Sequence, residues 1–513
     1  MPILTLLTFL PLAGALLLLA IPAERTQSLR RAALGTTVVT ALVGLFGLLR
    51  AYDPAIAVAQ LVEHAPWFTL PGTGIAVGYK LGVDGISFLM VLLTVLLMPV
   101  VIVSTHDHIG KRVKEFMVWM LVMETGMLGV FLSLDLVLFY VFWEVSLVPL
   151  YFVVGIWGGA NRLYATIKFF LYTVAGSLVM LVAAIALVYR TGTSDVAELV
   201  AAVPRLPFEL QTYLFFAFAL AFAIKVPILP FHTWLADAHT EAPTSGSVVL
   251  AAVLLKLGTY GLIRYGIELF PAVALEQSQL FMALGAIGIV YGALLAMAQS
   301  DLKRLIACSS VSHLGFVVLG MFALTSAGLR GSVLQMVNHG ISTGLLFLLV
   351  GMVYERRHTR QLDQFGGLAK PMPLFAFCLV FTVLSSVGLP GLNGFVGEYL
   401  ILLGSYQASP LWATVGVTGV VLGAVYLLSA TRRVLFGPVV HLENEALADM
   451  DRREAGMVIP LLVVAVWIGI FPNTFIARTS ATLDALGARI EAVRAERSAA
   501  LEAPAAIPGG AAR

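Results

Sequence analysis

Two lysines stand inside apolar runs, where a charge is unexpected. Lys225 lies in the run that starts near position 211, and Lys256 lies near the middle of the next run. Pro227 and Pro230 interrupt the helix just after Lys225, because proline lacks a backbone N–H and its ring clashes with the preceding turn. Charges inside a bilayer are costly and mark ion or proton pathways. This pattern therefore predicts a protein that moves charge through a membrane at a broken helix.

A carboxylate is available to pair with the first lysine. Glu144 lies about halfway along the apolar segment 136–156. An ionised carboxylate there costs several kcal/mol unless it is paired or hydrated. A Glu144–Lys225 pair would hold a proton on the lysine while closed and release it when open. The alternative is a structural ion pair that moves nothing.

Two histidines and a second glutamate lie further along the chain. His313 and His339 lie in apolar segments, and Glu398 follows an interruption at Pro390. Histidine can pass protons near neutral pH, because its unperturbed pKa is about 6.5. The serines beside His313 favour a hydrated path. The alternatives are ordinary hydrogen-bonded core histidines and a glutamate that faces water at a helix end.

Three other ionisable residues lie in or beside the apolar segments. Lys168 is close to a helix end, so we expect its amine to extend to the membrane interface. Asp135 falls in a short turn, where we expect it to be solvated. Glu124 lies within a predicted helix and could belong to the same polar network as Glu144.

The composition identifies the broad class. The 513 residues are 59% hydrophobic and 12% charged, whereas soluble domains contain about a quarter charged residues. The chain is therefore a polytopic membrane protein. Its two cysteines are far apart in the sequence, which excludes an iron–sulfur or zinc framework within this chain. No nucleotide motif is present, and no nucleic-acid partner is expected.

Windows of about 20 apolar residues predict membrane-spanning helices. We expect about fourteen, at 3–21, 32–50, 83–104, 115–132, 136–156, 165–189, 211–235, 246–266, 277–298, 304–323, 332–354, 373–403, 411–431 and 455–475. Lys and Arg gather in the connections that follow odd-numbered spans. The positive-inside rule then places these connections in the cytoplasm and both termini outside.

The organisation that we expect is an all-α bundle built from two similar halves. Aligning Pro230 with Pro390 superimposes the seventh and twelfth spans, and each is interrupted near its middle. The expected divisions are three N-terminal helices (1–112), a first repeat (113–270), a second repeat (271–436), and a last helix with its tail (437–513). The Ala/Gly/Pro-rich end, LEAPAAIPGGAAR, is predicted to fray.

Five segments carry a resemblance to a known family. They are FYVFWEVSLVPLY, PFHTWLADAHTEAPTSGSVVLA, SSVSHLGF, VNHGISTGLLFLLVGMVYERRHTR and LPGLNGFVGEYLIL. With them the chain resembles the antiporter-like subunits of respiratory complex I, the proton-pumping NADH:quinone oxidoreductase. Among these it is similar to the M-type chains, the bacterial counterparts of mitochondrial subunit 4. The family usually has proline where Ala236 stands.

The resemblance implies a fold and a set of proton-carrying residues. The implied fold has fourteen transmembrane helices, with helices four to eight and nine to thirteen as two inverted repeats and helices seven and twelve broken. The residues that match the family's translocation sites are Glu144, Lys225, Lys256, His313, His339 and Glu398. L-type and N-type chains usually have lysine at the last site, so Glu398 favours the M type. The long C-terminal amphipathic helix of the L type is expected to be absent.

The implied function is proton translocation coupled to redox chemistry in other subunits. FMN, iron–sulfur clusters and quinone are expected in partner chains and no cofactor in this one. The expected partners are the L-type and N-type chains of the membrane arm and membrane lipid, in the bacterial inner membrane. The main alternative is a large subunit of a multisubunit sodium/proton antiporter or of a membrane-bound hydrogenase. A solute transporter acting alone and a structural subunit that moves no ions are weaker alternatives, because buried Glu, Lys and His are costly when idle.

Overall fold

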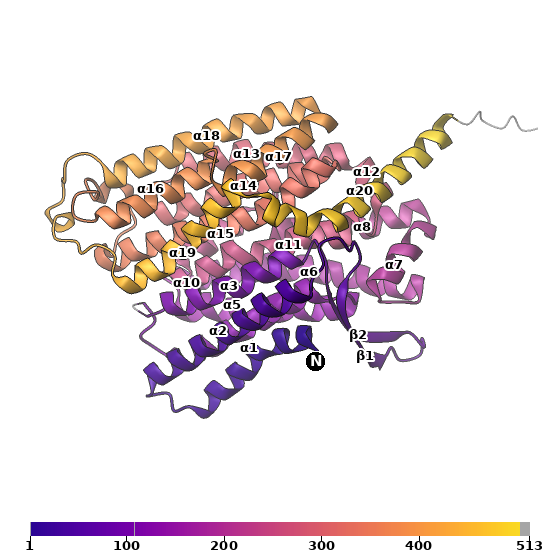
Figure 1. The fold of residues 1–513 in the computed structure, drawn as a ribbon, viewed down its shortest axis with the longest axis horizontal. Coiled ribbons are helices and arrows are strands. Elements are labelled where there is room, and N and C mark those ends of the chain that lie inside the picture. Colours follow the sequence, from indigo (N-terminus) through magenta and orange to yellow (C-terminus); the bar gives the residue numbers. More distant parts are fainter. Residues whose placement is uncertain (1, 107, 503–513) are drawn as a thin grey trace, which may run out of the picture.

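The computed structural model describes residues 2–106 and 108–502. Long helices lie side by side in one bundle (Figure 1). Within the described residues, twelve helices are long and apolar enough to cross a membrane: α1 (Ile3–Ala20), α2 (Thr26–Ala51), α4 (Val113–Leu132), α5 (Leu136–Trp157), α6 (Arg162–Thr191), α8 (Phe208–Lys225), the composite helix Thr244–Ile267, α13 (Ser278–Met297), α14 (Leu302–Phe322), α15 (Ser326–Arg357), α18 (Pro410–Leu435) and α19 (Arg452–Ile470).

Two shorter apolar helices, α3 (Phe88–Ser104) and α16 (Pro373–Val387), lie at the third and twelfth predicted positions. The prediction of a polytopic helical membrane protein is therefore confirmed. The count of fourteen spans and the inverted repeats stay predictions.

Both predicted interruptions are present. α8 ends at Lys225, and α9 (Thr233–Glu241) begins after a non-helical stretch that contains both prolines. In the second, α16 ends at Val387 and α17 (Asn393–Ala408) begins after a turn around Pro390. Gly388 and Gly391 in this turn have φ of +83° and +92°, a backbone conformation that glycine adopts without steric cost.

The composite helix is irregular around its lysine. It consists of α10 (Thr244–Val249), the π-helical stretch η2 (Leu250–Leu254), α11 (Leu255–Gly261) and a second π-helical stretch, η3 (Leu262–Ile267). π-helical turns are rare and are frequent at functional sites. Lys256 lies in the short regular segment between them.

The central helices are wrapped by peripheral ones. The composite helix, α14 and α15 are buried along their whole apolar lengths, whereas less than half of the apolar length of α1, α2, α6 and α18 is buried. The outward faces of these helices carry large apolar side chains, as at Val182 on α6, which is 68% exposed. The bundle thus keeps the charged central residues away from its apolar outer surface.

Two elements, a β-hairpin and a C-terminal helix, add to the predicted all-α fold with a frayed tail. Strands β1 (Gln60–Thr69) and β2 (Ala76–Val83) form an antiparallel hairpin in a connection of the otherwise helical fold. Helix α20 (Asn473–Glu502) follows α19 and extends beyond the bundle (Figure 1); the sequence analysis did not predict this helix, and the expected absence of the L type's amphipathic helix stays a prediction. The predicted fraying concerns mostly residues 503–513, which lie outside the described residues.

Both elements have local causes. In α20, Leu483, Leu486 and Ile490 are buried and recur every three or four residues, which is the spacing of one helical face. This short apolar stripe is too sparse to be detected as a membrane span. In the hairpin, Gly72 and Gly74 supply positive φ values in the loop between the strands. The remaining short elements are helices α7 (Val196–Ala202) and α12 (Pro271–Glu276) and three 3₁₀ turns.

Candidate functional site

Lys256 is in direct contact with His339. Its side chain is fully buried, and its Nζ lies 2.5 Å from the Ala251 carbonyl oxygen and 2.6 Å from His339 Nδ1. The carbonyl is an acceptor only, so the amine donates to it. The imidazole nitrogen can accept a proton or donate one, depending on its tautomer. The contact therefore joins two groups that can exchange a proton directly.

The other nitrogen of His339 has no protein partner. His339 Nε2 is buried and makes no hydrogen bond within the described part of the chain. The His313 ring lies nearby, with 5.9 Å between the two ring centroids. An unsatisfied buried polar atom costs about 1–3 kcal/mol, and a bridging water removes most of that cost. The two histidines are therefore placed for water-mediated proton transfer.

His313 connects onward to Glu398. Its Nδ1 lies 3.2 Å from Glu398 Oε1, and Gln335 Nε2 donates to the same oxygen at 3.1 Å. The Glu398 side chain is buried, at 5% exposed. α14, α15 and α17 each supply one member of this cluster. The second break positions it, because α17 starts five residues before Glu398.

Close packing of α15 against α17 fixes the carboxylate. A Cβ atom at Gly397 would lie 2.3 Å from Gln335 Oε1 and 2.8 Å from Asn338 Nδ2. Asn338 in turn donates to the Asn393 carbonyl at 2.7 Å. Only a residue without a side chain lets α17 approach this closely. The glycine thus holds Glu398 within reach of both its partners.

Lys225 lies apart from this chain of contacts. It is the last residue of α8 and is buried, at 2% exposed. Its amine faces the rings of Trp143 and Phe169, at 5.5 Å and 5.9 Å from their centroids. A cation gains about 0.5–2 kcal/mol from such aromatic faces. The lysine is thus held in an aromatic setting at the first break.

Glu144 does not form the predicted ion pair. Among the described residues the structure has no ion pair between Glu144 and Lys225, although Glu144 is partly buried and its Oε1 has no hydrogen-bond partner. Glu144 is nevertheless the charged side chain that acts on Lys225, so the two residues lie near each other without a direct contact. The structure places four of the six predicted residues in one series of contacts, and the Glu144–Lys225 pair stays a prediction.

Lys168 forms an ion pair. Its Nζ lies 2.7 Å from Asp237 Oδ2, and Arg304 Nη1 contacts the other oxygen of Asp237 at 3.0 Å. Asp237 lies on α9, the segment after the first break. An acidic residue on the segment after the first break therefore partners Lys168, and its position at the membrane interface stays a prediction.

Asp135 and Glu124 are both more buried than expected. Asp135 is 2% exposed and caps α5, accepting hydrogen bonds from the backbone of Val137 and Leu138 and from Ser194. The expectation that it is solvated was wrong, because N-terminal amides need an acceptor. Glu124 is fully buried, and neither carboxyl oxygen has a partner in the part of the chain that the structure describes.

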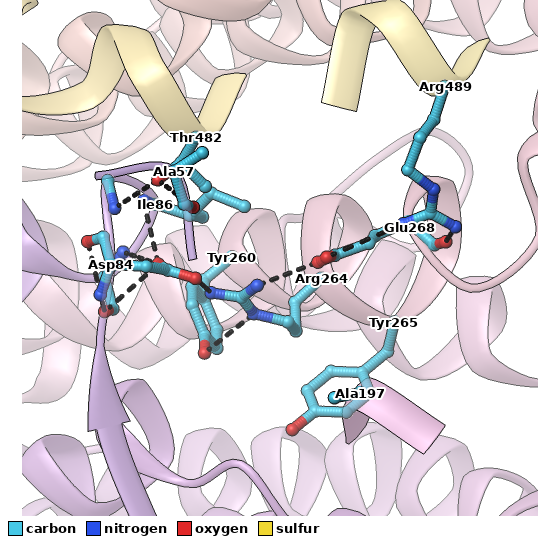
Figure 2. A network of polar contacts seen from close by, with 12 residues as sticks. Ala57, Asp84, Ile86, Ala197, Tyr260, Arg264, Tyr265, Glu268, Thr482 and Arg489 are labelled. Carbon is cyan, nitrogen blue, oxygen red and sulfur yellow. Dashed lines mark hydrogen bonds and ion pairs between the residues drawn. The ribbon is translucent and has the colours of Figure 1, made fainter. Parts of the chain in front are cut away.

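A buried cluster of charged residues lies at the C-terminal end of the composite helix (Figure 2), and the sequence analysis did not detect it. Arg264 is ion-paired with Asp84 and, at 2.8 Å, with Glu268, and its Nε lies 3.3 Å from the Tyr260 hydroxyl. Its side chain is only 4% exposed. The sequence analysis assigned Arg264 no role. Its place within the predicted span 246–266 was the signal that could have found it.

α20 is anchored to this cluster. Arg489 donates to the Glu268 carbonyl at 3.2 Å (Figure 2). The Thr482 hydroxyl donates to the Ala57 carbonyl and accepts a hydrogen bond from the Gly85 amide. Arg264 therefore links the end of the composite helix, the start of α3 and the C-terminal helix. Within residues 2–106 and 108–502, no group of three or more His, Cys, Asp or Glu could hold a metal ion.

Known proteins with similar sequences cover nearly the whole chain. It is 46% identical over 487 residues to NADH-quinone oxidoreductase subunit M of Rhodobacter capsulatus, covering 92% of this chain and 93% of that protein. It is 40% identical over 471 residues to NADH-ubiquinone oxidoreductase chain 4 of Marchantia polymorpha, covering 92% and 94%.

Solved structures share the fold. A chain of respiratory complex I from Thermus thermophilus with bound NADH superimposes with a TM-score of 0.86 at 32% identity, covering 96% of this chain and 100% of that one. A chain of the Mrp complex from Dietzia sp. DQ12-45-1b gives 0.84 at 20% identity, covering 96% and 100%; at that identity only the fold is shared. The family model of the NADH:quinone oxidoreductase/Mrp antiporter transmembrane region matches residues 133–423, and the chain belongs to this family.

Proposed function

We propose that this chain is the proton-translocating membrane subunit of an NADH:quinone oxidoreductase. The observation that carries the proposal is the contact series Lys256–His339–His313–Glu398, whose members come from four helices, the composite helix, α15, α14 and α17. Each member can hold or release a proton, and each neighbour lies within direct contact or one water. The similarity to subunit M proteins over nine-tenths of the chain supports the same function.

The chain itself performs no redox chemistry in this proposal. FMN, the iron–sulfur clusters and quinone belong to partner subunits, and their reaction changes the charge state at the end of the membrane arm. That change closes or opens a Glu144–Lys225 pair. Lys225 then passes its proton toward Lys256, and the proton continues through His339 and His313 to Glu398.

The free energy needed to move one proton across the membrane is similar to the free energy available from a pKa change in one carrier. Moving one charge against 100 mV costs about 2.3 kcal/mol. A change of two pKa units in a carrier corresponds to about 2.7 kcal/mol. Forming or breaking one buried ion pair shifts the pKa of a lysine by about this amount. One pair per transported proton is therefore sufficient.

The proposed setting is the membrane arm of a multisubunit complex. We infer neighbours of the L and N types, a bacterial inner membrane, and both termini on the outer side, because Lys and Arg gather in the opposite connections. The fourteen spans and the two inverted repeats belong to the same proposal. The exposed apolar faces of α6 and α18 provide surfaces for lipid or for neighbouring subunits.

Proton uptake by membrane vesicles that contain the assembled complex tests this function. We expect NADH addition to drive proton uptake that does not require sodium, and Glu144→Gln to lower both uptake and quinone reduction. Sodium-dependent uptake without NADH would instead assign the chain to a sodium/proton antiporter. Normal uptake in an assembled Glu144→Gln complex would make the carboxylate structural and contradict the coupling role.

A further inference from the structure

A groove lies on the side of the bundle between helices α2, α3 and α19. α3 packs against both other helices, so segments from the two ends of the sequence lie side by side here (Figure 1). The groove consists of two adjoining hollows of about 570 Å³ and 330 Å³, and Val103 and Arg453 line both of them. The proton pathway described above makes no use of this region.

The floor of the groove is apolar. Pro99, Val100 and Val103 of α3 line it and are partly exposed. Leu96 lies one turn before Pro99 and Val100 on the same face of α3 and is 42% exposed. Met457 of α19 also lines the groove. An apolar stripe therefore runs along α3, and it fits an acyl chain, which is as apolar as a leucine side chain.

Four arginines gather at the end of the groove that the charge distribution assigns to the cytoplasm. They are Arg30 and Arg31 of α2 and Arg452 and Arg453 of α19. Arg31 and Arg452 are exposed and form no ion pair with another described residue. Arg453 lies 3.4 Å from the exposed Asp451, and none of the described residues that line the two hollows is acidic. The lining of this end is therefore strongly basic.

The positions of these arginines concentrate positive charge in the groove. Arg30 is held at the end of α3, where its Nη1 and Nη2 donate to the carbonyl oxygens of Thr105 and Ile109 at 3.0 Å and 2.5 Å. Arg452 and Arg453 are the first two residues of α19, where the helix dipole already contributes positive charge. An anion bound at this end would be stabilised by all of these charges.

We propose that the groove binds an anionic phospholipid of the cytoplasmic leaflet. Its headgroup phosphate lies on the four arginines and one acyl chain lies along the apolar stripe of α3. Basic pockets between transmembrane helices suit anionic headgroups, and the guanidinium fork matches the oxygens of a phosphate. The inference goes beyond the proposed function and requires only that the bundle spans a membrane, so a failure of the proton pathway would leave it standing.

The charge distribution decides between a phospholipid and a helix of a neighbouring subunit. An apolar helix would cover the floor of the groove equally well. It would leave Arg31 and Arg452 without an anion, however, and a buried charge is costly unless it is paired. A phospholipid with a negative headgroup satisfies the floor and the arginines together.

Two variants address the two parts of this site. Arg31→Gln/Arg452→Gln removes two positive charges from side chains that form no ion pair in the described part of the chain. Gly456→Leu fills the groove beside α3, because Gly456 lines it and no atom lies within 4 Å of a Cβ atom added there. The first variant weakens headgroup binding, and the second excludes the acyl chain.

Each variant has a matched control outside the groove. Arg432→Gln/Arg433→Gln removes the same charge from two exposed arginines in the last turn of α18. Gly35→Leu adds the same side chain at a position of α2 that does not line the groove and that also has no atom within 4 Å of an added Cβ atom. Both controls should bind lipid as the wild type does.

Lipid binding is measured on the purified, assembled complex. Phosphatidylglycerol or phosphatidylcholine is titrated into the detergent solution, and the lipid molecules retained by each complex are counted by native mass spectrometry. A density map of the wild-type complex in nanodiscs that contain phosphatidylglycerol identifies what lies between α2, α3 and α19.

We expect the map to show a phospholipid with its headgroup at the four arginines. The double arginine variant should need about thirtyfold more phosphatidylglycerol for the same retention, because each basic residue near an anionic headgroup contributes about fivefold. Gly456→Leu should retain one phosphatidylglycerol fewer than wild type. Wild type should retain fewer phosphatidylcholine than phosphatidylglycerol molecules at equal concentration.

Three results would overturn the proposal. They are a polypeptide helix in the groove, equal retention of the two lipids by wild type, and wild-type retention of phosphatidylglycerol by the double arginine variant. A matching loss in the arginine control would also overturn it, because the effect would then be one of net charge. Should Gly456→Leu fail to assemble, the double arginine variant and the density map carry the test.

Discussion

Lys256 Nζ lies 2.6 Å from His339 Nδ1, and this contact joins two of the three helices that are buried along their whole apolar lengths. The lysine comes from a short α-helical segment between two π-helical stretches, and the histidine comes from the middle of α15. The contact is thus made by two central elements that are shielded from lipid. A proton held here can leave toward His313 through His339 Nε2, the ring nitrogen that has no hydrogen-bond partner among the described residues.

Glu398→Gln tests the far end of the pathway. The amide keeps the shape of the carboxylate and its contact with Gln335 but cannot bind a transferable proton. We expect a loss of coupled quinone reduction and proton uptake of about a hundredfold or more, with normal assembly. Glu491→Gln is the matched control, because Glu491 is 59% exposed on α20. Wild-type pumping in Glu398→Gln would remove Glu398 from the pathway.

Gly397→Ala tests the packing that holds this carboxylate. The added methyl group would lie 2.3 Å from Gln335 Oε1, so Gln335 or α17 must shift. We expect reduced pumping together with a loss of thermal stability of about 1–3 kcal/mol, the usual cost of overpacking. Gly487→Ala on α20, where no atom would lie within 4 Å of the new carbon, should leave both unchanged. Equal behaviour of the two variants would contradict the close-packing argument.

Asp84→Asn tests the buried Arg264 cluster. Removing one partner of a buried ion pair costs up to about 3–5 kcal/mol, and in this variant Arg264 keeps Glu268 as its remaining ion-pair partner. We expect the purified complex to lose this subunit, or α20 to detach, at a lower temperature than in wild type. Thermal unfolding followed by limited proteolysis at α20 measures both effects.

The control for this cluster is an exposed ion pair. Arg330 and Asp484 lie 2.6 Å apart with 31% and 48% of their side chains exposed, and exposed pairs contribute about 0–1 kcal/mol. Asp484→Asn should therefore change thermal stability little. A similar loss in both variants would mean that burial of Arg264 adds no stability.

The sequence predicted the helices and the breaks because their signals are local. Long apolar runs identify spans by length alone, and proline marks the interruptions after Lys225 and near Pro390. The roles assigned to Lys256, His313, His339 and Glu398 came from the family resemblance. The structure places these four side chains next to one another, which no local signal in the sequence could establish.

The remaining features depend on contacts between distant segments. Arg264 meets Asp84 across 180 residues, and Asp135 accepts a hydrogen bond from Ser194 of another connection. α20 is recognisable by its apolar stripe only once a surface for that stripe is known. Trp143, the neighbour of Glu144 on α5, faces Lys225, because the orientation of side chains on α5 depends on how that helix packs.

The most direct test of the central claim is NADH-driven proton uptake by vesicles that contain the assembled Lys256→Met complex. Methionine has a similar length and no titratable group, so the contact with His339 is lost while the core stays filled. The proposed pathway predicts that proton uptake collapses and that quinone reduction falls with it. Wild-type uptake and turnover in a fully assembled Lys256→Met complex would contradict the pathway.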